Sequence, residues 1–218
     1  MPRIIDVLLS ILALLVLFPL FVSIVIILLL TGEHKVFYLQ KRVGYKNKNF
    51  KIIKFATMLS NSENMGSGSL TLKNDPRVLP FGSFLRKTKI NELPQILNII
   101  IGDLSIVGPR PQMQVDFEKY SYDVQKKIYN VRPGLTGIGS IIFRDEESLI
   151  SLAAENENPH DFYKRVIAPY KGELEIWYQS HRSLFLDFQL IFLTAWALVT
   201  PETRLYEKWF KDLPIRNF

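Results

Sequence analysis

The sequence predicts a mostly helical α+β fold in which a membrane-inserted N-terminal helix precedes one compact domain. Val7–Leu30 is a run of 24 residues without a charged side chain, long enough for a membrane helix. Val36–Phe55 alternates apolar and polar residues around turn-forming residues 43–49, which is typical of a small β-hairpin. Much of the remaining chain has apolar residues at helical spacing. We therefore expect a membrane element over residues 1–33 and a single domain over residues 34–218.

Composition narrows the possible partners and chemistries. The net charge of +6 is compatible with nucleic acid, an anionic membrane surface or phosphate-bearing substrates. The long apolar segment beside a basic cluster favours a membrane surface and phosphate-bearing substrates. Nucleic acid is disfavoured, because the lysines lack the interleaved stacking aromatics of a nucleic-acid-binding module. The absence of cysteine excludes disulfides, thiolate metal sites and thiol catalysis. The three histidines do not have metal-ligand spacing.

The topology of the apolar N-terminal segment has two readings. Pro19 lies near its middle, where it removes a helical hydrogen bond and kinks the helix. Arg3 precedes the segment, and seven basic residues but no acidic ones occur from Lys35 to Lys54 after it. Because basic flanks favour the cytoplasmic side, both ends are drawn to the same face, which a re-entrant helix satisfies and a simple span does not. Sequence physics alone leaves both forms open. A cleaved signal peptide is disfavoured by the length of the apolar run and the absence of an A-x-A-like site.

A polar loop and a segment rich in functional residue types follow the hairpin. Ser60–Ser69 is expected to be a flexible loop that covers the site, although its Gly66-Ser67-Gly68 is too weak a signal for a phosphate loop. In Lys87–Pro111, Thr88 and Asn91 are good N-cap residues and Pro94 is tolerated only in a first turn. We therefore predict a helix from Asn91 or Glu92 to Ile101, ended by Gly102.

Two features of Lys87–Pro111 favour anion binding. The predicted helix places Glu92 and free backbone N–H groups at a helix N-terminus, where phosphate or a metal–phosphate complex is stabilised. In Gly108-Pro109-Arg110-Pro111, two prolines restrict the backbone around a guanidinium that can bind phosphate with two hydrogen bonds. The alternatives are an ordinary helix cap and a rigid surface turn.

The second half of the chain predicts four elements. Val115–Tyr129 has the periodicity of a surface helix, Arg132–Gly137 reads as a type II turn with positive φ at Gly134, and Phe162–Ser180 reads as an amphipathic helix. Ser183–Val199 is apolar but contains Asp187, whose burial in lipid would cost roughly 2.5–3.5 kcal/mol. An interfacial helix is therefore expected there, with nearby Trp and Tyr side chains at headgroup level.

The chain resembles the bacterial sugar transferase family, the small monotopic phosphoglycosyl transferases, over residues 3–193. Five motifs carry this resemblance, in family order: Phe37-x-x-Gln40-x-Arg42-x-Gly44, Phe50-Lys51-Ile52-x-Lys54-Phe55-x-Thr57-Met58, Glu92-Leu93-Pro94-Gln95, Gly102-Asp103-Leu104-Ser105-Ile106-Val107-Gly108-Pro109-Arg110-Pro111 and Arg132-Pro133-Gly134-Leu135-Thr136-Gly137. The resemblance implies transfer of a phospho-sugar from a UDP-sugar to undecaprenyl (polyprenol) phosphate, the first step of glycan or polysaccharide assembly. It also implies a re-entrant helix with Asp6 and Pro19 at family spacing, and a place on the cytoplasmic face of the bacterial inner membrane. Oligomeric state and the identity of the sugar are left open.

The resemblance also assigns residues to a site. It places a catalytic pair at Asn91 and Glu92, with Glu92 holding Mg²⁺, which binds through one or two carboxylates plus substrate phosphates. Around the diphosphate and acceptor it implies further substrate-binding residues: Lys54, Arg86, Arg110, Arg144 and Asp187. The acidic run Asp145-Glu146-Glu147 departs from the common family sequence and is either a solvated helix start or the source of another carboxylate.

One position departs from the family at its centre. The family carries an aspartate where this chain has Asn91, and that aspartate is understood to attack the β-phosphate of the nucleotide sugar. An amide is a very poor nucleophile, so Asn91 cannot fill this role. Three explanations follow: a subgroup that transfers directly to the polyprenol phosphate or uses another acid such as Glu92 or Asp145, an engineered substitution, or a catalytically inactive relative that binds nucleotide sugar or lipid phosphate.

Overall fold

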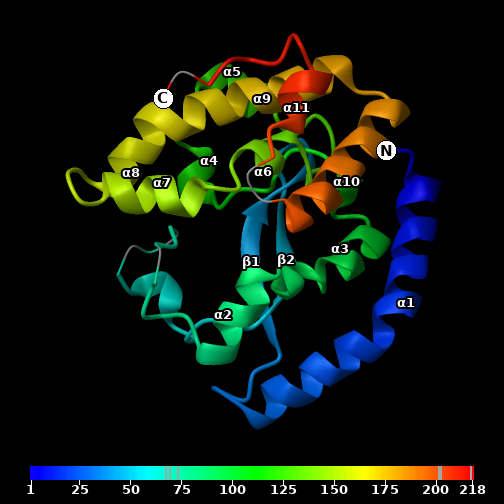
Figure 1. Cartoon of the computed structure of the whole chain (residues 1–218), viewed down its shortest axis with the longest axis vertical. Helices are drawn as coiled ribbons and strands as arrows, with labels where there is room; N and C mark the ends of the chain where they lie inside the picture. Colours follow the sequence, from blue (N-terminus) through cyan, green and yellow to red (C-terminus); the bar gives the residue numbers. More distant parts are fainter. Residues whose placement is uncertain (67, 69, 73, 201–202, 217) are drawn as a thin grey trace.

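The computed structural model describes residues 1–218 except 67, 69, 73, 201–202 and 217. Its longest element is the apolar helix α1 (Arg3–Leu30), which follows a bent path along the outside of the domain (Figure 1). Pro19 lies inside this helix, as expected for a kinked segment, and helical structure continues through it from Arg3 to Leu30, so the kinked segment is one bent helix without a break. Most of its surface is apolar and exposed.

Both ends of α1 contact the same domain. Near the N-terminal end, buried Asp6 accepts hydrogen bonds from the Ser105 hydroxyl and from Ile106 N–H, each at 2.9 Å. Near the C-terminal end, Ile24 and Leu28 pack in a buried cluster with residues of the hairpin and of the following helix. The apolar helix is therefore attached at two points to the same domain.

The predicted hairpin is confirmed. β1 (Phe37–Val43) and β2 (Asn49–Phe55) pair antiparallel, with Phe37 opposite Phe55. The carboxamide of Asn98 accepts from Ile53 N–H at 2.9 Å and donates to the Lys51 carbonyl at 2.8 Å, which fastens the next helix to the edge of β2.

The segment that joins the hairpin to this helix is built differently from the sequence expectation. α2 (Pro80–Lys87) has Thr88 as its C-cap, and Lys89 has a positive φ of 59°. A 3₁₀ turn (Ile90–Glu92) and Pro94 then lead into α3 (Gln95–Ile101), which Gly102 ends in the left-handed region. The predicted start of the α-helix at Asn91 or Glu92 is therefore wrong, because both residues lie within the 3₁₀ turn, and the Asn91 side chain makes no recorded capping bond to the described residues. The predicted end is confirmed.

Two short strands form a second sheet. β3 (Ser105–Val107) pairs in parallel with β4 (Gly134–Thr136). The predicted type II turn at Arg132–Gly137 is wrong, because this segment is extended by its pairing with β3 and Gly134 is not among the glycines with positive φ. Gly134 is needed for another reason: a Cβ atom there would lie 2.1 Å from the backbone nitrogen of Gly108.

The predicted surface helix Val115–Tyr129 is two short helices, α4 (Gln114–Phe117) and α5 (Tyr122–Lys127). Ser121 interrupts the run, because its extended backbone starts α5 and its hydroxyl caps Val124 N–H. The aromatic side chains Phe117, Tyr120 and Tyr129 are buried rather than exposed. This region is therefore part of the core.

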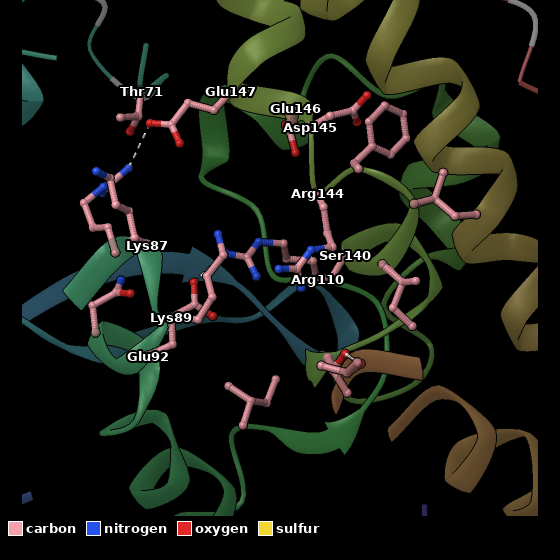
Figure 2. Close-up of a pocket in the computed structure, with 18 of the residues that line it drawn as sticks. Thr71, Lys87, Lys89, Glu92, Arg110, Ser140, Arg144, Asp145, Glu146 and Glu147 are labelled. Carbon is pink, nitrogen blue, oxygen red and sulfur yellow. Dashed lines mark hydrogen bonds and ion pairs between the residues drawn. The ribbon is translucent and has the colours of Figure 1, made fainter. Parts of the chain in front are cut away.

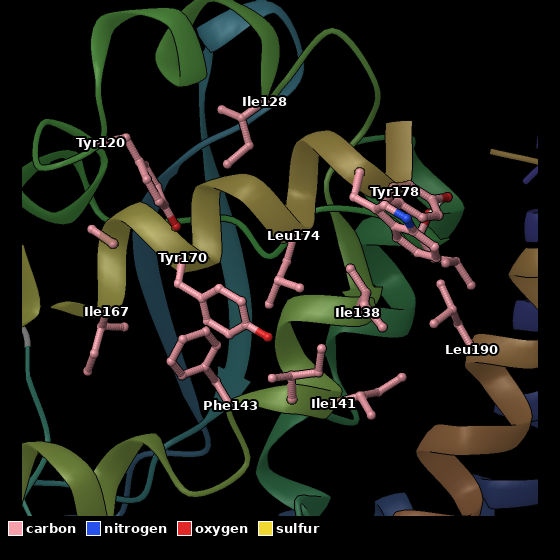
Figure 3. Close-up of a cluster of buried hydrophobic side chains, with 14 of the residues drawn as sticks. Tyr120, Ile128, Ile138, Ile141, Phe143, Ile167, Tyr170, Leu174, Tyr178 and Leu190 are labelled. Atoms are coloured by element: carbon pink, nitrogen blue, oxygen red, sulfur yellow. Dashed lines mark hydrogen bonds between the residues drawn. The ribbon is translucent and has the colours of Figure 1, made fainter. Parts of the chain in front are cut away.

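The remaining helices enclose the core. The chain continues through α6 (Ile138–Ile142), α7 (Glu146–Ala153), α8 (Pro159–Phe162), a π turn (Tyr163–Ile167), α9 (Ala168–His181), α10 (Leu184–Val199) and α11 (Leu205–Trp209), and a short 3₁₀ turn (Ser62–Asn64) lies earlier in the polar loop. Leu174 of α9 points toward Ile138 and Ile141 of α6, and Leu190 of α10 belongs to the same buried cluster (Figure 3).

The two long C-terminal helices confirm the predicted helical segments but differ in burial. The predicted amphipathic helix Phe162–Ser180 corresponds to the α8–α9 run. Most of α9 is buried, and a narrow face with Pro169, Glu173 and Ser180 is exposed, so this amphipathic helix packs in the core. α10 buries Leu186, Leu190 and Leu193, whereas its opposite side exposes Phe185, Phe188 and Trp196. An exposed apolar face is what an interfacial helix requires.

Candidate functional site

A wide pocket lies between the hairpin, the α2–α3 segment and the start of α7. Six of the seven predicted site residues line it: Lys54, Arg86, Asn91, Glu92, Arg110 and Arg144. In Figure 2, Lys89 and Glu92 approach from the α2–α3 segment, and Arg110 and Arg144 lie opposite. Four segments that are distant in sequence therefore place one carboxylate among several cations.

The pair formed by Glu92 and Arg110 is the centre of this arrangement. Nη2 of Arg110 donates to Oε1 of Glu92 at 2.7 Å. Burial acts to raise the pKa of the Glu92 carboxyl, but the positive charges of Arg110, Lys54 and Lys89 outweigh it and hold that pKa well below its usual range. The negative charge of Glu92 raises the pKa of Arg110 in turn. Both groups are charged in the folded protein.

The neighbouring cations are held in an unfavourable environment. Burial, together with the charge of Arg42, lowers the pKa of the Lys54 ammonium to about 7, although Glu92 opposes this shift. Burial also lowers the pKa of Lys89 and of Arg144. Desolvated positive charges that repel one another are stabilised by an anion, so the pocket is electrostatically suited to a diphosphate.

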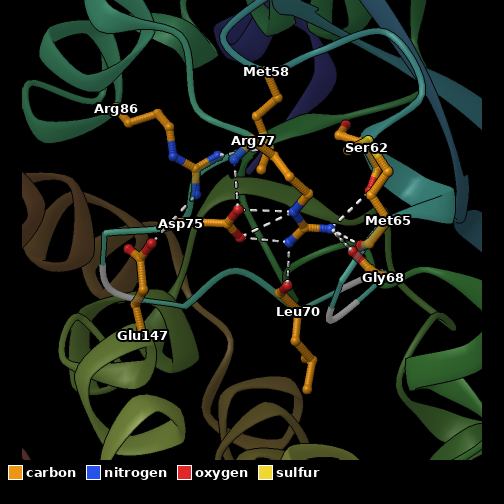
Figure 4. A network of polar contacts seen from close by, with 9 residues as sticks. All are labelled: Met58, Ser62, Met65, Gly68, Leu70, Asp75, Arg77, Arg86 and Glu147. Carbon is orange, nitrogen blue, oxygen red and sulfur yellow. Dashed lines mark hydrogen bonds and ion pairs between the residues drawn. The ribbon is translucent and has the colours of Figure 1, made fainter.

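Arg86 and the acidic run face each other across the pocket. Nη2 of Arg86 lies 3.6 Å from Oε1 of Glu147, so this guanidinium points at a protein carboxylate rather than at Glu92 (Figure 4). The whole acidic run is paired, which leaves no spare carboxylate there: Asp145 with Arg216 at 3.0 Å, Glu146 with Lys171 at 2.7 Å and Glu147 with Arg86. Glu146 begins α7, and all three carboxylates belong to ion pairs on the wall of the pocket.

The polar loop before α2 forms part of the pocket wall. Arg77, which is buried, pairs with Asp75 and donates to the carbonyls of Ser62, Met65 and Leu70 at 2.7–2.8 Å (Figure 4). These bonds draw the described part of the loop around one guanidinium. Ser67 and Ser69, which belong to the predicted mobile cover, lie outside the described residues.

Asp187 was predicted to bind substrate, and the structure places it elsewhere. It does not line the pocket: its carboxylate is buried, accepts from the Tyr178 hydroxyl at 2.7 Å and pairs with the amino group of Met1 at 2.9 Å. It faces protein rather than lipid, as expected, but its partners are structural groups. The sequence could not distinguish these roles, because both need a buried aspartate on the same helix.

Asn91, which the resemblance assigns to the position of the family nucleophile, lines the pocket with 7% of its surface exposed. Its Oδ1 atom is buried without a hydrogen-bond partner in the part of the chain that the structure describes. A buried carbonyl oxygen without a donor is unfavourable by about 1–3 kcal/mol, so a ligand that donates to it would stabilise the site.

A metal ion would find one suitable protein ligand. Among the described residues, no group of three or more His, Asp or Glu side chains could hold a metal. Glu92 has one oxygen bonded to Arg110 and one further oxygen. Because Mg²⁺ often binds through one carboxylate, substrate phosphates and water, Glu92 fits an ion that arrives with a diphosphate better than a resident one.

Sequence reasoning missed several residues of this region. Arg42 lies inside one of the motifs and lines the pocket, although the resemblance did not assign it to the site. Lys89 also lines the pocket, and nothing in the sequence indicates the left-handed backbone conformation that it adopts there. Tyr129 and Glu175, described below, contact the Arg110 backbone from behind the pocket.

The chain also matches known proteins. A sequence model described as bacterial sugar transferase matches residues 1–201. The exopolysaccharide production protein ExoY of Sinorhizobium fredii is 38% identical over 164 residues, which cover 68% of this chain and 72% of that protein. A UDP-N-acetylgalactosamine-undecaprenyl-phosphate N-acetylgalactosaminephosphotransferase of Aeromonas hydrophila is 30% identical over 197 residues, covering 89% of this chain and 43% of the relative. A UDP-glucose:undecaprenyl-phosphate glucose-1-phosphate transferase of Xanthomonas campestris is 31% identical over 201 residues, covering 91% and 38%. The match thus spans less than half of the last two relatives.

Proposed function

This chain belongs to the bacterial sugar transferase family, and we propose that it transfers a phospho-sugar from a UDP-sugar to a polyprenol phosphate such as undecaprenyl phosphate. Two of the relatives carry this activity in their names, and the family match covers the predicted site residues of the pocket, from Lys54 to Arg144. In the reaction an oxygen of the lipid phosphate bonds to the β-phosphorus of the UDP-sugar. The bond to the α-phosphate oxygen breaks, and UMP leaves.

The observation that carries the proposal is the combination of cations and apolar helices in one pocket. Lys54 and Arg110 offer positive charge for the diphosphate, and they neutralise charge that accumulates on the leaving UMP. The same pocket is lined by Leu17 of α1 and by Ile191 and Leu198 of α10. A phosphate on a polyprenol chain has this mixed character, so it can enter from the apolar side while the water-soluble UDP-sugar enters from the other.

The placement in the membrane follows from α1. It is long and apolar enough to cross a membrane by length and composition. However, Asp6 and Leu28, near its two ends, both contact the domain, and a straight span would carry one end to the opposite face. These contacts support a re-entrant helix. We propose the cytoplasmic side for the domain, because both flanks of α1 are basic and UDP-sugars are made on that side.

Asn91 determines the order of events. Because a carboxamide does not attack phosphorus, the lipid phosphate attacks directly while both substrates are bound. Glu92 cannot readily replace the missing nucleophile, because its ion pair with Arg110 stabilises the carboxylate in place. Kinetics with both substrates are expected to be sequential, and mass spectrometry of protein incubated with labelled UDP-sugar alone should detect no phospho-sugar adduct. An adduct mapped to residue 91 would contradict direct transfer.

Mg²⁺ has a defined place in this proposal. When bound with the diphosphate, it would neutralise phosphate charge, and Glu92 would be its protein ligand. Arg110 keeps Glu92 ionised and oriented, whether or not the ion is present.

Asn91 also supports a second candidate, a membrane-anchored relative that binds nucleotide sugar or lipid phosphate without turnover. One experiment separates the two. The purified chain in lipid nanodiscs, with undecaprenyl phosphate and Mg²⁺, is given a panel of UDP-sugars, and UMP release is measured. Acceptor-dependent UMP release supports the transferase. Binding of a UDP-sugar without UMP release from any member of the panel supports the inactive relative.

A further inference from the structure

The backbone around Arg110 is held by a tyrosine hydroxyl that does not line the pocket. Tyr129 follows α5 and is 1% exposed. Its hydroxyl donates to the Arg110 carbonyl at 2.9 Å and accepts from Gln112 N–H at 2.9 Å. One hydroxyl therefore fixes two backbone groups on either side of Pro111.

A carboxyl group approaches the same residue from the other side. Oε1 of Glu175, on α9, lies 3.4 Å from Arg110 N and accepts its N–H. Glu175 is 1% exposed, and its Oε2 has no hydrogen-bond partner among the described residues. A Cβ atom at Gly139 would lie 2.4 Å from Oε1, so the absence of a side chain on α6 makes room for this carboxyl.

The charged and polar groups near Glu175 leave Arg110 N–H as the hydrogen-bond partner of its carboxyl. Burial raises its pKa to about 7, whereas the Arg110 N–H and the charges of Lys171 and Arg110 act to lower it. Lys171 lies one turn earlier on α9, but its ammonium is bonded to Glu146 at 2.7 Å. The hydroxyls of Tyr120, Tyr129 and Tyr178 interact with the charge of Glu175. The only hydrogen bond that the structure records for the Glu175 carboxyl, in the part it describes, is the one from Arg110 N–H.

We infer that Tyr129 and Glu175 are positioning residues for the transfer reaction, acting on substrate only through Arg110. Together they hold the N–H and the carbonyl of Arg110, and so aim its guanidinium at Glu92 and at the diphosphate. The inference rests on the proposed function for its kinetic consequence, but the positioning itself can be measured without turnover.

The first test removes one hydroxyl. Tyr129→Phe keeps the ring but removes the only recorded partner of Gln112 N–H, and it leaves the Arg110 carbonyl with only the longer bond from Nε2 of Gln112 at 3.3 Å. We expect kcat/KM for the UDP-sugar to fall by up to about 100-fold, because small displacements of a positioned group have effects of this size. Amide hydrogen exchange of the full chain in nanodiscs should become faster at Arg110 and Gln112. Tyr122→Phe is the control, because Tyr122 lies on the neighbouring helix α5 but is 69% exposed and does not line the pocket. Wild-type exchange at Arg110 and Gln112 in Tyr129→Phe would overturn the inference, even if no UDP-sugar is turned over.

The second test asks whether the effect passes through Arg110. In an Arg110→Lys background, Tyr129→Phe should cause a much smaller further loss than in the wild type, since the group that it positions is already replaced. An equal loss in both backgrounds would assign Tyr129 a general structural role and refute the inference.

Glu175 gives a test that does not depend on the tyrosine variant folding. Glu175→Ala should speed exchange at Arg110 and slow turnover, and Glu175→Gln should restore both, because an amide oxygen can accept the same N–H. Glu173→Gln, an exposed neighbour on α9, is the control. Equal behaviour of the alanine and glutamine variants would remove Glu175 from the inference.

Discussion

Replacing Arg110 by lysine tests whether the site depends on the shape of a guanidinium or only on its charge. Nη2 of Arg110 donates to Oε1 of Glu92 at 2.7 Å, and the arginine side chain is 33% exposed on the pocket side. A guanidinium can keep this bond and still present a second N–H to a phosphate in the same plane. Lysine keeps the charge, but its single ammonium cannot hold both partners in fixed geometry.

The expected loss can be estimated from one hydrogen bond. A hydrogen bond to a charged group contributes about 1.5–3 kcal/mol. If Arg110→Lys loses one such bond in the transition state, kcat/KM falls roughly 10- to 150-fold. Because the ion pair with Glu92 can be kept by lysine, the thermal midpoint should change little.

The assay is UMP release at limiting UDP-sugar, with protein in nanodiscs and saturating lipid phosphate. Arg165→Lys is the matched control: Arg165 pairs with Glu157 through two bonds at 2.7 and 2.8 Å, but the pair is on the surface and outside the pocket. This control should retain wild-type turnover. If Arg110→Lys also retained it while folding normally, the guanidinium would have no specific role and the account of the site would be refuted.

Three further predictions concern titration and topology. Burial raises the pKa of Glu175 from 4.5 to about 7, so between these pH values the folded state keeps a proton that the unfolded chain releases, and the folded protein loses stability as the pH rises. Glu175→Gln should therefore stabilise the protein by about 3 kcal/mol at pH 8 and by little at pH 4. Thermal unfolding at the two pH values measures this, and an equal effect at both would contradict it. Burial lowers the pKa of Lys54 to about 7, so much of its ammonium is neutral at pH 8, and a bound diphosphate should restore the charge. Binding of a UDP-sugar at pH 8 should therefore be accompanied by uptake of a proton, which calorimetry in two buffers of different ionisation enthalpy measures. Lys54→Arg should abolish this uptake, because arginine is always charged. Arg3→Cys and Lys48→Cys should be labelled from the same side of the membrane, and labelling from opposite sides would exclude the re-entrant form.

Local features of the fold were predictable because local physics decides them. The hairpin followed from alternation around turn residues, and the end of α3 followed from Gly102, which takes the left-handed conformation without a Cβ penalty. Gly134 was assigned to a turn because glycine is favoured both in turns with positive φ and where two backbones approach closely, and the sequence alone does not distinguish these cases. Only the pairing of β3 with β4, about thirty residues apart, decides between these roles.

The sequence predicted the site residues that lie in a recognisable motif, but not those that reach the site only through the packing of distant helices. Lys54, Glu92 and Arg110 lie in the quoted motifs, and the structure brings them into one pocket. Glu175 looks from sequence like a charged residue on a helix, and nothing in its neighbours indicates that α9 is the core helix that turns it toward Arg110. Long-range contacts of this kind depend on the assembled core.

The measurement that tests the central claim most directly follows the β-phosphorus itself. UDP-sugar labelled in its β-phosphate is incubated with the protein and undecaprenyl phosphate, and label is counted in the lipid and aqueous phases. Transfer of a phospho-sugar predicts that label moves into the lipid phase in step with UMP release, and only when the acceptor is present. Label that stays in the aqueous phase with every UDP-sugar, or that remains on the nucleotide while the sugar moves to lipid, would contradict it.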